Sequence, residues 1–463
     1  MLRIFKQYYP IRNALFIFGE GIFIFLSVIL ACWVLLGRES VSAGSAPVFR
    51  ALLITIICQL CLYYNDLYDL KITDTLTELG VRLLQALGAA AIILAFIYFI
   101  FPGFIISEGI FIVTVAFVIV LIVSWRIGYT HILNKGLFNQ KIVILGSSDT
   151  AKEIAKEIQH KKDCGYEIVS VIAKNVWPEL TCDLKVNMIC QNSYENICEI
   201  AQKMGVKKIV VAIREKRGAF PIKELLKCRV NGIDILDGNT FYEMLTGKLI
   251  VEQINPSWLI FSSGFQKTKL QKIIKRTVDL VISLGLLILL SPLIIIVAIL
   301  IKIDSAGPVF FSQERVGENH HPYMVHKFRS MRSDAEKETG PVWAKDNDDR
   351  ITRLGRFIRK WRVDEIPQLW NVLKGEMSFV GPRPEREHFV KQLMELIPYY
   401  GERFTVKPGL TGWAQVSYGY GASVRDAIEK LNYDLFYIKN MSILMDIMIV
   451  ARTVKTVIFG HGR

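Results

Sequence analysis

The chain has 463 residues, of which 52% are hydrophobic and 21% charged, and its formal net charge is +13. This composition excludes a disordered chain, and the length predicts two to four domains of about 100–200 residues each. Long apolar runs in the first third also exclude a wholly soluble protein. A basic membrane protein is suited to anionic lipid headgroups and to phosphorylated substrates.

Four apolar stretches come first, at residues 14–36, 48–64, 81–101 and 109–129, and each is near the about 20 residues that cross a bilayer as a helix. The first is too long for a cleavable signal and leads to no cleavage site. Basic residues flank the set at both ends: Arg3, Lys6, Arg12, Arg126, Lys135 and Lys141. An even number of spans with these flanks predicts that both ends of the region face the cytoplasm.

Three side chains inside these runs have two interpretations. Glu20 lies in the first run, where a carboxylate is either functional or close enough to the helix end to reach water. Cys58 and Cys61 form a CxxC, but they are one helical turn apart in a membrane segment. We interpret both as small apolar side chains rather than as a redox or zinc site. Since no cysteine follows Cys228, the last half of the chain offers no thiol nucleophile.

From residue 139 short strand-like runs alternate with helical stretches. The runs are residues 141–145, 168–173, 208–213 and 232–236. This alternation predicts a Rossmann-like domain with a parallel sheet over residues 139–250. The turn at 146–151 keeps only one glycine of the dinucleotide fingerprint. We interpret it as a packing turn in a domain that binds no dinucleotide.

A linker at 251–271 leads to a fifth apolar run at 278–301 with Ser291-Pro292 at its middle. Proline removes one N–H and clashes with the carbonyl four residues earlier, so the helix bends there, and the Ser291 hydroxyl can satisfy a freed carbonyl. Two topologies remain. Hydropathy alone favours a kinked helix that spans the membrane. The nucleotide chemistry expected after the run favours a re-entrant hairpin that enters and leaves by the cytoplasmic face.

Residues 351–362 alternate apolar and basic side chains at helical spacing. The apolar set is Ile351, Leu354, Phe357, Ile358 and Trp361, and the basic set is Arg353, Arg356, Arg359, Lys360 and Arg362. This pattern predicts an amphipathic helix on an anionic membrane surface, with a solvated charged helix as the alternative.

Asp364-Glu365 follows directly and is succeeded by Pro367. Asp364 could simply cap a helix that ends at Gly375. The same place suits catalysis, because a helix start keeps a carboxylate ionised and attracts phosphate. Arg383 stands between two prolines, a rigid setting that suits a bidentate grip on phosphate oxygens. A proline turn that exposes an arginine is the plain alternative.

Four ordered motifs carry a family resemblance: KFRSM at 327–331, ITRLGRFIRK at 351–360, DEIPQLWNVLKGEMSFVGPRPE at 364–385 and KPGLTGWAQV at 407–416. They resemble the bacterial sugar transferase family, the monotopic phosphoglycosyl transferases, over about residues 272–460. The front of the chain resembles the large members, such as undecaprenyl-phosphate glucose or galactose phosphotransferases. Residues 416–423 depart from the usual continuation and look more like the exosortase and exopolysaccharide branch, which leaves the sugar open.

The resemblance implies a membrane α-helical plus α/β architecture. Its parts are four transmembrane helices in residues 1–135, the Rossmann-like domain, and a mainly helical catalytic domain over 272–463 whose re-entrant helix bends at Ser291 and Pro292. Asp364 matches the nucleophile and Glu365 its partner in an acidic dyad that also binds Mg²⁺. The residues matched to the substrate diphosphate are Lys327, Arg329, Arg359 and Arg383.

The implied reaction moves a hexose-1-phosphate from a UDP-hexose to polyprenyl (undecaprenyl) phosphate and releases UMP at the inner (cytoplasmic) membrane, as the first step of an exopolysaccharide repeat unit. The implied partners are therefore the donor, the acceptor and the lipid bilayer, with no nucleic acid; a homodimer is left open. A membrane-bound nucleotide-sugar dehydratase or epimerase is the alternative, but it needs an intact glycine fingerprint and a Tyr-x-x-x-Lys pair. A non-enzymatic scaffold would leave Asp364, Glu365 and Arg383 unexplained.

Overall fold

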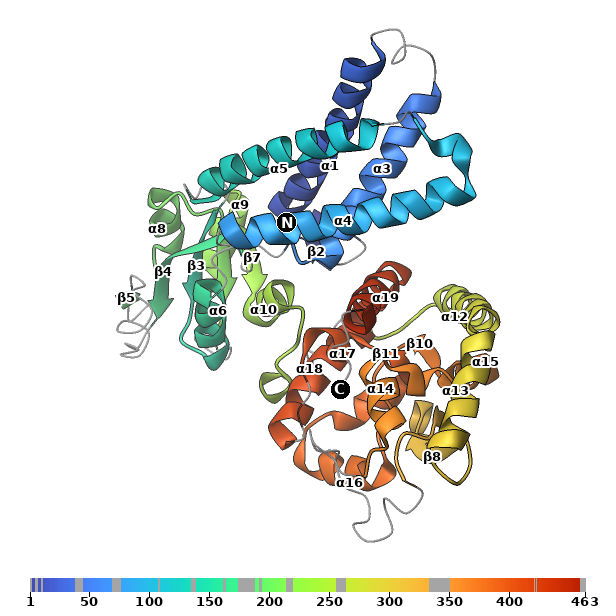
Figure 1. Ribbon diagram of the computed structural model, residues 1–463. Coiled ribbons are helices and arrows are strands. Elements are labelled where there is room, and N and C mark those ends of the chain that lie inside the picture. Colours follow the sequence, from blue (N-terminus) through green and yellow to red (C-terminus); the bar gives the residue numbers. More distant parts are fainter. Residues whose placement is uncertain are drawn as a thin grey trace. The chain divides into compact units, whose positions relative to one another are not determined.

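The computed structural model describes residues 2–4, 7–9, 11–37, 45–68, 76–106, 109–134, 139–160, 164–173, 188–190, 194–213, 220–254, 264–332, 350–419, 421 and 423–458 (Figure 1). The chain divides into two compact units that meet in sequence at Leu236 and Asp237. Each unit is described by itself.

The first unit begins with a small pair of strands, β1 (Leu2–Ile4) and β2 (Gln7–Tyr9), and four helices. These are α1 (Ile11–Leu36), α3 (Ser45–Tyr64), α4 (Leu76–Ile100) and α5 (Ile110–Asn134), with the short turn η1 (Pro102–Phe104) before the last. Within the described residues, three segments are long and apolar enough to cross a membrane: Ala14–Leu36, Thr77–Ile100 and Ile112–Ile132. The apolar part of α3, Val48–Tyr64, is shorter, so the fourth span stays a prediction.

A buried ion pair joins two of these helices. The Arg126 guanidinium donates to Glu20 Oε1 at 2.8 Å and to the Leu67 carbonyl at 2.7 Å, and both charged side chains are almost fully buried. The sequence predicts that Arg126 flanks the helix and that Glu20 is either functional or reaches water. The flanking position and the access to water are both wrong, because α5 continues to Asn134 and each buried charge is compensated by the other. Cys58 and Cys61 are buried in the apolar core of the same helices, in agreement with their apolar interpretation.

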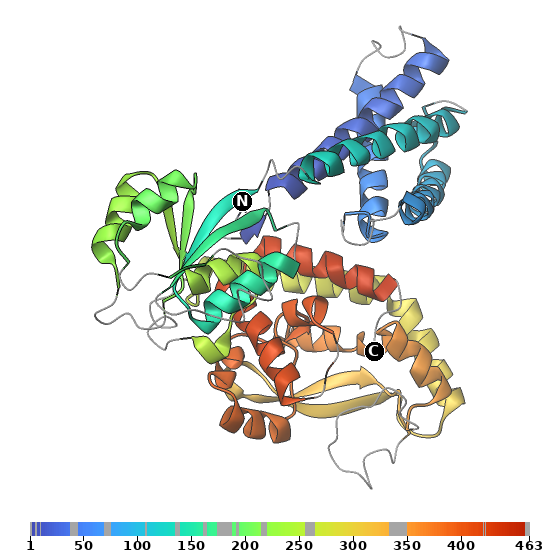
Figure 2. The same ribbon diagram turned by 90° about the vertical axis from the view of Figure 1, so that its left-hand side faces the viewer.

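The predicted parallel sheet is confirmed, and Figure 2 shows its strands side by side with helices packed around them. In the described residues it has five strands in the order β5-β4-β3-β6-β7. The strands are β3 (Gln140–Leu145), β4 (Tyr166–Ala173), β5 (Met188–Cys190), β6 (Lys208–Val211) and β7 (Asp234–Asp237). The helices that alternate with them are α6 (Asp149–His160), α8 (Ile197–Lys203) and α9 (Ile222–Val230). The β-branched centre of β3 is fully buried, as expected for a strand covered on both faces.

Gly146 shows why the turn after β3 keeps one glycine. Its φ is +112°, and a Cβ there would lie 2.4 Å from the Ala212 carbonyl oxygen, so no side chain fits. The glycine is required by the approach of the segment after β6. This contact supports the interpretation of a packing turn. That the domain binds no dinucleotide stays a prediction.

The second unit is mainly helical. Its helices are α10 (Gly238–Thr246), α12 (Lys269–Leu289), α13 (Ser291–Asp304), α14 (Arg353–Lys360), α15 (Gln368–Lys374), α16 (Glu387–Leu396), α17 (Trp413–Ser417), α18 (Val424–Asn440) and α19 (Ile443–Ile458). Short 3₁₀ turns are η2 (Val251–Gln253), η3 (Glu318–His320), η4 (Val363–Glu365) and η5 (Tyr400–Thr405). Strands β8 (Phe310–Val316) and β9 (Pro322–Phe328) pair antiparallel, and β10 (Ser378–Val380) and β11 (Gly409–Thr411) pair parallel.

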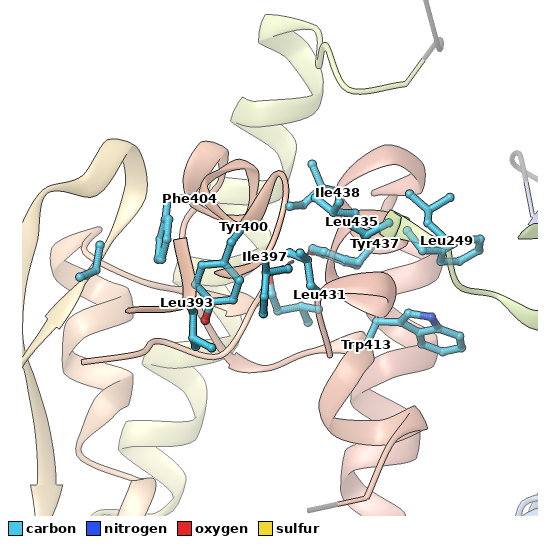
Figure 3. Packing of buried hydrophobic residues seen from close by; sticks show 14 of the residues in the cluster. Leu249, Leu393, Ile397, Tyr400, Phe404, Trp413, Leu431, Leu435, Tyr437 and Ile438 are labelled. Atoms are coloured by element: carbon cyan, nitrogen blue, oxygen red, sulfur yellow. Dashed lines mark hydrogen bonds between the residues drawn. The ribbon is translucent and has the colours of Figure 1, made fainter. Parts of the chain in front are cut away.

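The largest core of this unit lies around α18 (Figure 3). Leu431, Leu435 and Tyr437 of α18 pack with side chains from α16, η5 and α17. The segment from α10 to η2 belongs to this core, because Trp413 Nε1 donates to the Gly247 carbonyl at 2.8 Å and Leu249 N to the Asn432 carbonyl at 3.1 Å. The division between the two compact units, at residues 236 and 237, therefore lies before residue 250, where the sequence predicts that the Rossmann-like domain ends. The bounds of the functional domains stay predictions.

Helices α12 and α13 form a bent apolar pair where the sequence predicts the hairpin. Their axes differ by 60° across a break at Leu290, and the Ser291 hydroxyl donates to the Ile288 carbonyl at 2.8 Å. Proline at the second position of α13 needs no N–H partner, so it begins a new helix at low cost. The bend is present where the sequence places it. Whether the pair crosses the bilayer or re-enters stays a prediction.

A re-entrant hairpin predicts that both of its ends face the cytoplasm. Single cysteines engineered at Lys272 and Gly317 should react with a membrane-impermeant maleimide only from the cytoplasmic side. A cysteine at Gly103, in the connection between α4 and α5, is the control and should react from the other side. Labelling of the 272 and 317 sites from opposite sides would establish a fifth span. Pro292→Ala should reduce activity, since it permits a straighter helix.

Candidate active site

The acidic dyad lies on a 3₁₀ turn rather than at the start of a helix. Turn η4 holds both carboxylates, and the helix predicted to begin at Asp364 begins four residues later as α15. The Asp364 side chain caps nothing there, so the capping alternative is wrong, whereas the predicted end at Gly375 is confirmed by its φ of +90°. Arg362, with a φ of +52°, turns the chain sharply before the dyad.

Glu365 is surrounded by cations. Its Oε1 accepts hydrogen bonds from Lys327 Nζ at 3.0 Å and from Arg383 Nη2 at 2.9 Å, and its Oε2 accepts from Arg362 Nη1 at 3.5 Å. Burial alone would raise the pKa of Glu365, but the charges of Arg383, Lys327 and Arg362 together hold it well below its usual range. Glu365 is therefore a permanent anion that fixes three cations.

Asp364 has a different environment although it is adjacent. Its side chain is buried, and no hydrogen bond reaches its carboxylate from the described part of the chain. Burial, followed by the charge of Glu365, raises the pKa of Asp364 to about 6, against the opposing effect of Lys327, Arg359 and Arg383. The two carboxylates are thus unequal: one is held by cations, and the other keeps its oxygens available.

The cations come from segments far apart in sequence. Lys327 lies near the end of β9, and Asn371 of α15 ties that strand in place by donating to the Met324 carbonyl at 2.6 Å and accepting from His326 N at 3.1 Å. Arg383 follows β10. Its side chain remains 40% exposed while one nitrogen holds Glu365, so the guanidinium can also reach a ligand. Arg383 and the dyad belong to the same sequence motif, which predicts that they lie together. No local pattern in the sequence predicts that Asn371 holds β9.

The other two predicted substrate cations are placed differently. Arg329 is buried and donates to Ser305 and Ala306 at the end of α13, at 2.6–3.0 Å. Its guanidinium is engaged with the apolar hairpin, not with the dyad. Arg359 lowers the pKa of Asp364 by its charge, without a hydrogen bond to that carboxylate among the described residues. A direct contact of either arginine with the substrate stays a prediction.

Apolar packing connects the hairpin to the dyad. Val297 and Ile301 of α13 are buried against Phe328 of β9 and Ile358 of α14. The residues on either side of the dyad, Val363 and Ile366, pack on the same cluster. The end of α13 and the dyad therefore belong to one packed body, which keeps the two carboxylates close to the apolar helix pair.

The predicted amphipathic helix is shorter than its pattern. Helix α14 begins after Thr352, whose hydroxyl accepts from Gly355 N at 2.9 Å, and ends at Lys360. Leu354 and Ile358 contribute to the cluster beneath α13, so they face protein. Phe357 is 60% exposed, which leaves one large apolar side chain among the arginines for a membrane surface.

Comparisons with known proteins agree with these motifs. Residues 270–460 match the model of the family described as bacterial sugar transferase, and residues 63–236 match one described as a CoA-binding domain. The UDP-glucose:undecaprenyl-phosphate glucose-1-phosphate transferase of Escherichia coli (strain K12) is 31% identical over 71% of this chain and 70% of its own length. The undecaprenyl-phosphate galactose phosphotransferase of Salmonella typhimurium is 30% identical over 75% of this chain and 74% of its own length.

The chain belongs to the bacterial sugar transferase family. The expectation of a large-form member is thereby confirmed. The UDP-N-acetylgalactosamine-undecaprenyl-phosphate N-acetylgalactosaminephosphotransferase of Aeromonas hydrophila is 40% identical over 51% of this chain, and the match spans only 55% of that relative. These relatives are named for three different sugars, so their names do not select one for this sugar transferase.

The segment in which this sugar transferase departs from the resemblance is tied together by Asp426. Tyr418 OH donates to Asp426 Oδ1 at 2.8 Å, and Ser423 exchanges hydrogen bonds with Asp426 at the start of α18. Tyr420 and Ala422 lie outside the described residues. The departure is thus associated with a specific turn before α18, whose effect on sugar choice stays a prediction.

The acidic dyad is the candidate site for Mg²⁺. No group of three or more His, Cys, Asp or Glu side chains that could hold a metal is found within the described ranges. Mg²⁺ needs no such cage, because it commonly takes one or two carboxylates and fills its other positions with water and substrate phosphate. Asp364 offers oxygens without hydrogen-bond partners in the described part, so the dyad fits an ion that arrives with a diphosphate.

Arg383→Lys tests the importance of the guanidinium geometry. The charge is retained, but an ammonium cannot hold Glu365 and a phosphate oxygen with a planar fork. We expect turnover to fall by about 10²-fold, similar to the loss of one preorganised electrostatic donor. UMP release and the melting temperature should be measured together. Near-normal turnover would make Arg383 an ordinary surface arginine.

The pKa of Asp364 predicts a pH dependence. The predicted role of Asp364 as nucleophile requires an ionised carboxylate, so kcat/KM should fall about tenfold for each pH unit below about 6 and level off above it. Arg383→Ala removes a charge that lowers the pKa of Asp364, so its residual activity should titrate at a higher pH than that of the wild type. A profile that is flat between pH 5 and 7 would contradict this assignment.

Proposed function

We propose that this sugar transferase moves a sugar-1-phosphate from a UDP-hexose to polyprenyl phosphate, releases UMP, and thereby starts an exopolysaccharide repeat unit at the cytoplasmic face of the inner membrane. The observation that carries the proposal is the inequality of the dyad. One buried carboxylate is held by three cations and its neighbour has available oxygens. The relatives are named as transferases that use undecaprenyl phosphate, and we propose the same acceptor here.

In the first step, a carboxylate oxygen of Asp364 attacks the sugar-bearing phosphorus of the donor. The bond from that phosphorus to the bridging oxygen breaks, and UMP leaves with the electron pair. No general base is required, because an aspartate is already ionised above its pKa. The product on the protein is a phospho-sugar linked to Asp364 as an acyl phosphate.

In the second step, a phosphate oxygen of the polyprenyl acceptor attacks the same phosphorus. The bond to Asp364 breaks, the carboxylate is regenerated, and the polyprenyl diphospho-sugar departs. Both steps bring anions together, so they need counter-charges held in advance. Glu365 provides this indirectly, since it holds Lys327 and Arg383 on either side of its Oε1.

Mg²⁺ is proposed as the cofactor, held by the dyad of Asp364 and Glu365. Bound there, it would supply further neutralisation of the substrate diphosphate. Because both oxygens of Glu365 already accept from cations, Asp364 offers the less engaged ligand atoms.

A lipid acceptor requires a site at headgroup depth. The apolar hairpin packs on the residues that flank the dyad, and exposed Phe357 and Trp370 lie on the helices immediately before and after it. Aromatic side chains with basic neighbours suit the membrane interface. We therefore propose that α12 and α13 re-enter on the cytoplasmic side and that the basic face of α14 lies on anionic lipid.

A nucleotide assay tests the reaction class. The purified protein, with undecaprenyl phosphate and Mg²⁺, should release UMP from at least one member of a panel of UDP-sugars. Formation of a keto-sugar that is still linked to UDP, with no UMP released, would instead support a dehydratase. Recovery of every donor unchanged would support a scaffold.

The covalent step has its own test. Labelled UMP should exchange into the UDP-sugar with no lipid acceptor present, as expected for a ping-pong mechanism. Asp364→Asn should abolish the exchange, whereas Glu365→Gln should retain part of it. If active wild-type protein exchanges label only when the acceptor is added, direct transfer in a ternary complex is the better mechanism.

A further inference from the structure

The loop that carries Arg383 is held at four consecutive main-chain carbonyls. The Pro382 carbonyl accepts from Gly409 N at 2.8 Å, and the Glu385 carbonyl accepts from Val316 N at 3.0 Å. Between them, the Arg383 carbonyl accepts from Arg403 Nη2 at 3.0 Å, and the Pro384 carbonyl accepts from Arg315 Nη1 at 3.4 Å. Two of the four donors are therefore arginine side chains.

Arg403 is built into the core. It lies on η5 and is only 6% exposed, and its Nη2 also contacts Asp434 Oδ2 at 2.9 Å. Its Nη1 donates to Tyr400 OH at 2.5 Å. Asp434 on α18 is 2% exposed, so the ion pair has little freedom to move. Of the hydrogen bonds that Arg403 donates, the one to the Arg383 carbonyl reaches the loop of the active site.

Arg315 holds the next carbonyl, that of Pro384. It lies on β8, its Nη2 donates to Gln313 Oε1 at 2.7 Å, and its Nη1 lies 4.0 Å from Glu385 Oε2. Since Val316 N binds the Glu385 carbonyl, consecutive residues of one strand hold consecutive residues of the loop.

A small cavity of about 10 Å³ adjoins the loop and is lined by Pro382, Pro384, Arg403 and Phe404 among others. Gly381 N, just before the loop, donates to the Thr411 carbonyl at 2.8 Å. Pro382 and Pro384 stiffen the chain but offer no N–H groups, so at these two positions the main chain can be held only through its carbonyls.

We propose that Arg403, together with Arg315, acts as a positioning residue that holds the Pro382–Arg383–Pro384 main chain so that the Arg383 guanidinium meets both Glu365 and the substrate diphosphate. The inference rests on the proposed role of Arg383 as a diphosphate ligand. Arg403 and Arg315 themselves act through main-chain carbonyls and are assigned no contact with substrate.

The test introduces Arg403→Lys into the wild-type protein and into the Arg383→Lys variant. Lysine keeps the positive charge beside Asp434. Its single ammonium group cannot replace the branched guanidinium that contacts Asp434, Tyr400 and the Arg383 carbonyl at once. We expect the Kd for UDP, measured by calorimetry with Mg²⁺, to rise about tenfold, and kcat/KM for UMP release to fall by about 10²-fold, as for a small displacement of a binding group. In the Arg383→Lys background the same change should cost less than about threefold, because residues that act through one another are not additive.

Arg276→Lys is the matched control. Arg276 also donates to main-chain carbonyls, those of Val372 and Leu373 at the end of α15, so its variant reports the general cost of such a change. We expect a lower melting temperature with the Kd for UDP unchanged. If Arg403→Lys does not fold, Arg315→Lys replaces it, with a smaller increase in Kd because its bond to the loop is longer.

The outcomes separate the two proposals. Equal losses in both backgrounds, or an Arg403→Lys variant that binds UDP as the wild type does, would overturn the positioning role. Wild-type protein that binds UDP but releases no UMP from any donor would overturn the proposed reaction, while the calorimetric comparison still decides the role of Arg403. Wild-type protein that does not bind UDP at all would overturn both.

Discussion

The burial of Glu365 is the constraint on which the catalytic unit depends. Removing a carboxylate from water costs several kcal/mol, and the cost is recovered only if opposite charges with good hydrogen-bond geometry surround it. Lys327 from β9, Arg383 from the loop after β10 and Arg362 from the turn before the dyad meet this need. One anion thus brings a strand, a 3₁₀ turn and a proline-rich loop to the same place.

The same interactions make two neighbouring carboxylates chemically different. The cations are consumed as hydrogen-bond donors by Glu365, so Asp364 feels their charge at longer range and mostly experiences burial and its anionic neighbour. A carboxylate with a raised pKa is a stronger base and holds its electron pairs less tightly. The two adjacent carboxylates differ because only Glu365 is within hydrogen-bond reach of the fixed cations.

Membrane attachment and chemistry share one packed cluster. The second half of α13 buries Val297 and Ile301 against the strand that carries Lys327, and Arg329 closes the end of the same helix. A shift of the hairpin would therefore move Lys327 and the dyad with it. This arrangement suits the proposed re-entrant topology, in which the depth of the hairpin in the bilayer would determine the depth of the site. The buried pair of Glu20 and Arg126 has a comparable role among the helices of the first unit, where it joins α1 to α5.

The sequence by itself determined the features that depend on neighbouring residues: the apolar runs, the alternation of strands and helices, the bend at Pro292, the end of α15 at Gly375, and the motifs of the family. Each is encoded by periodicity or by the conformation of one residue. Tertiary structure decided that Arg126 pairs with Glu20, that Arg329 binds the end of α13, that Asp364 caps no helix, and that Arg403 and Arg315 hold the loop of Arg383. These outcomes depend on distances between segments 20 to more than 100 residues apart, because the partner that neutralises a buried charge is set by packing and not by its position in the chain.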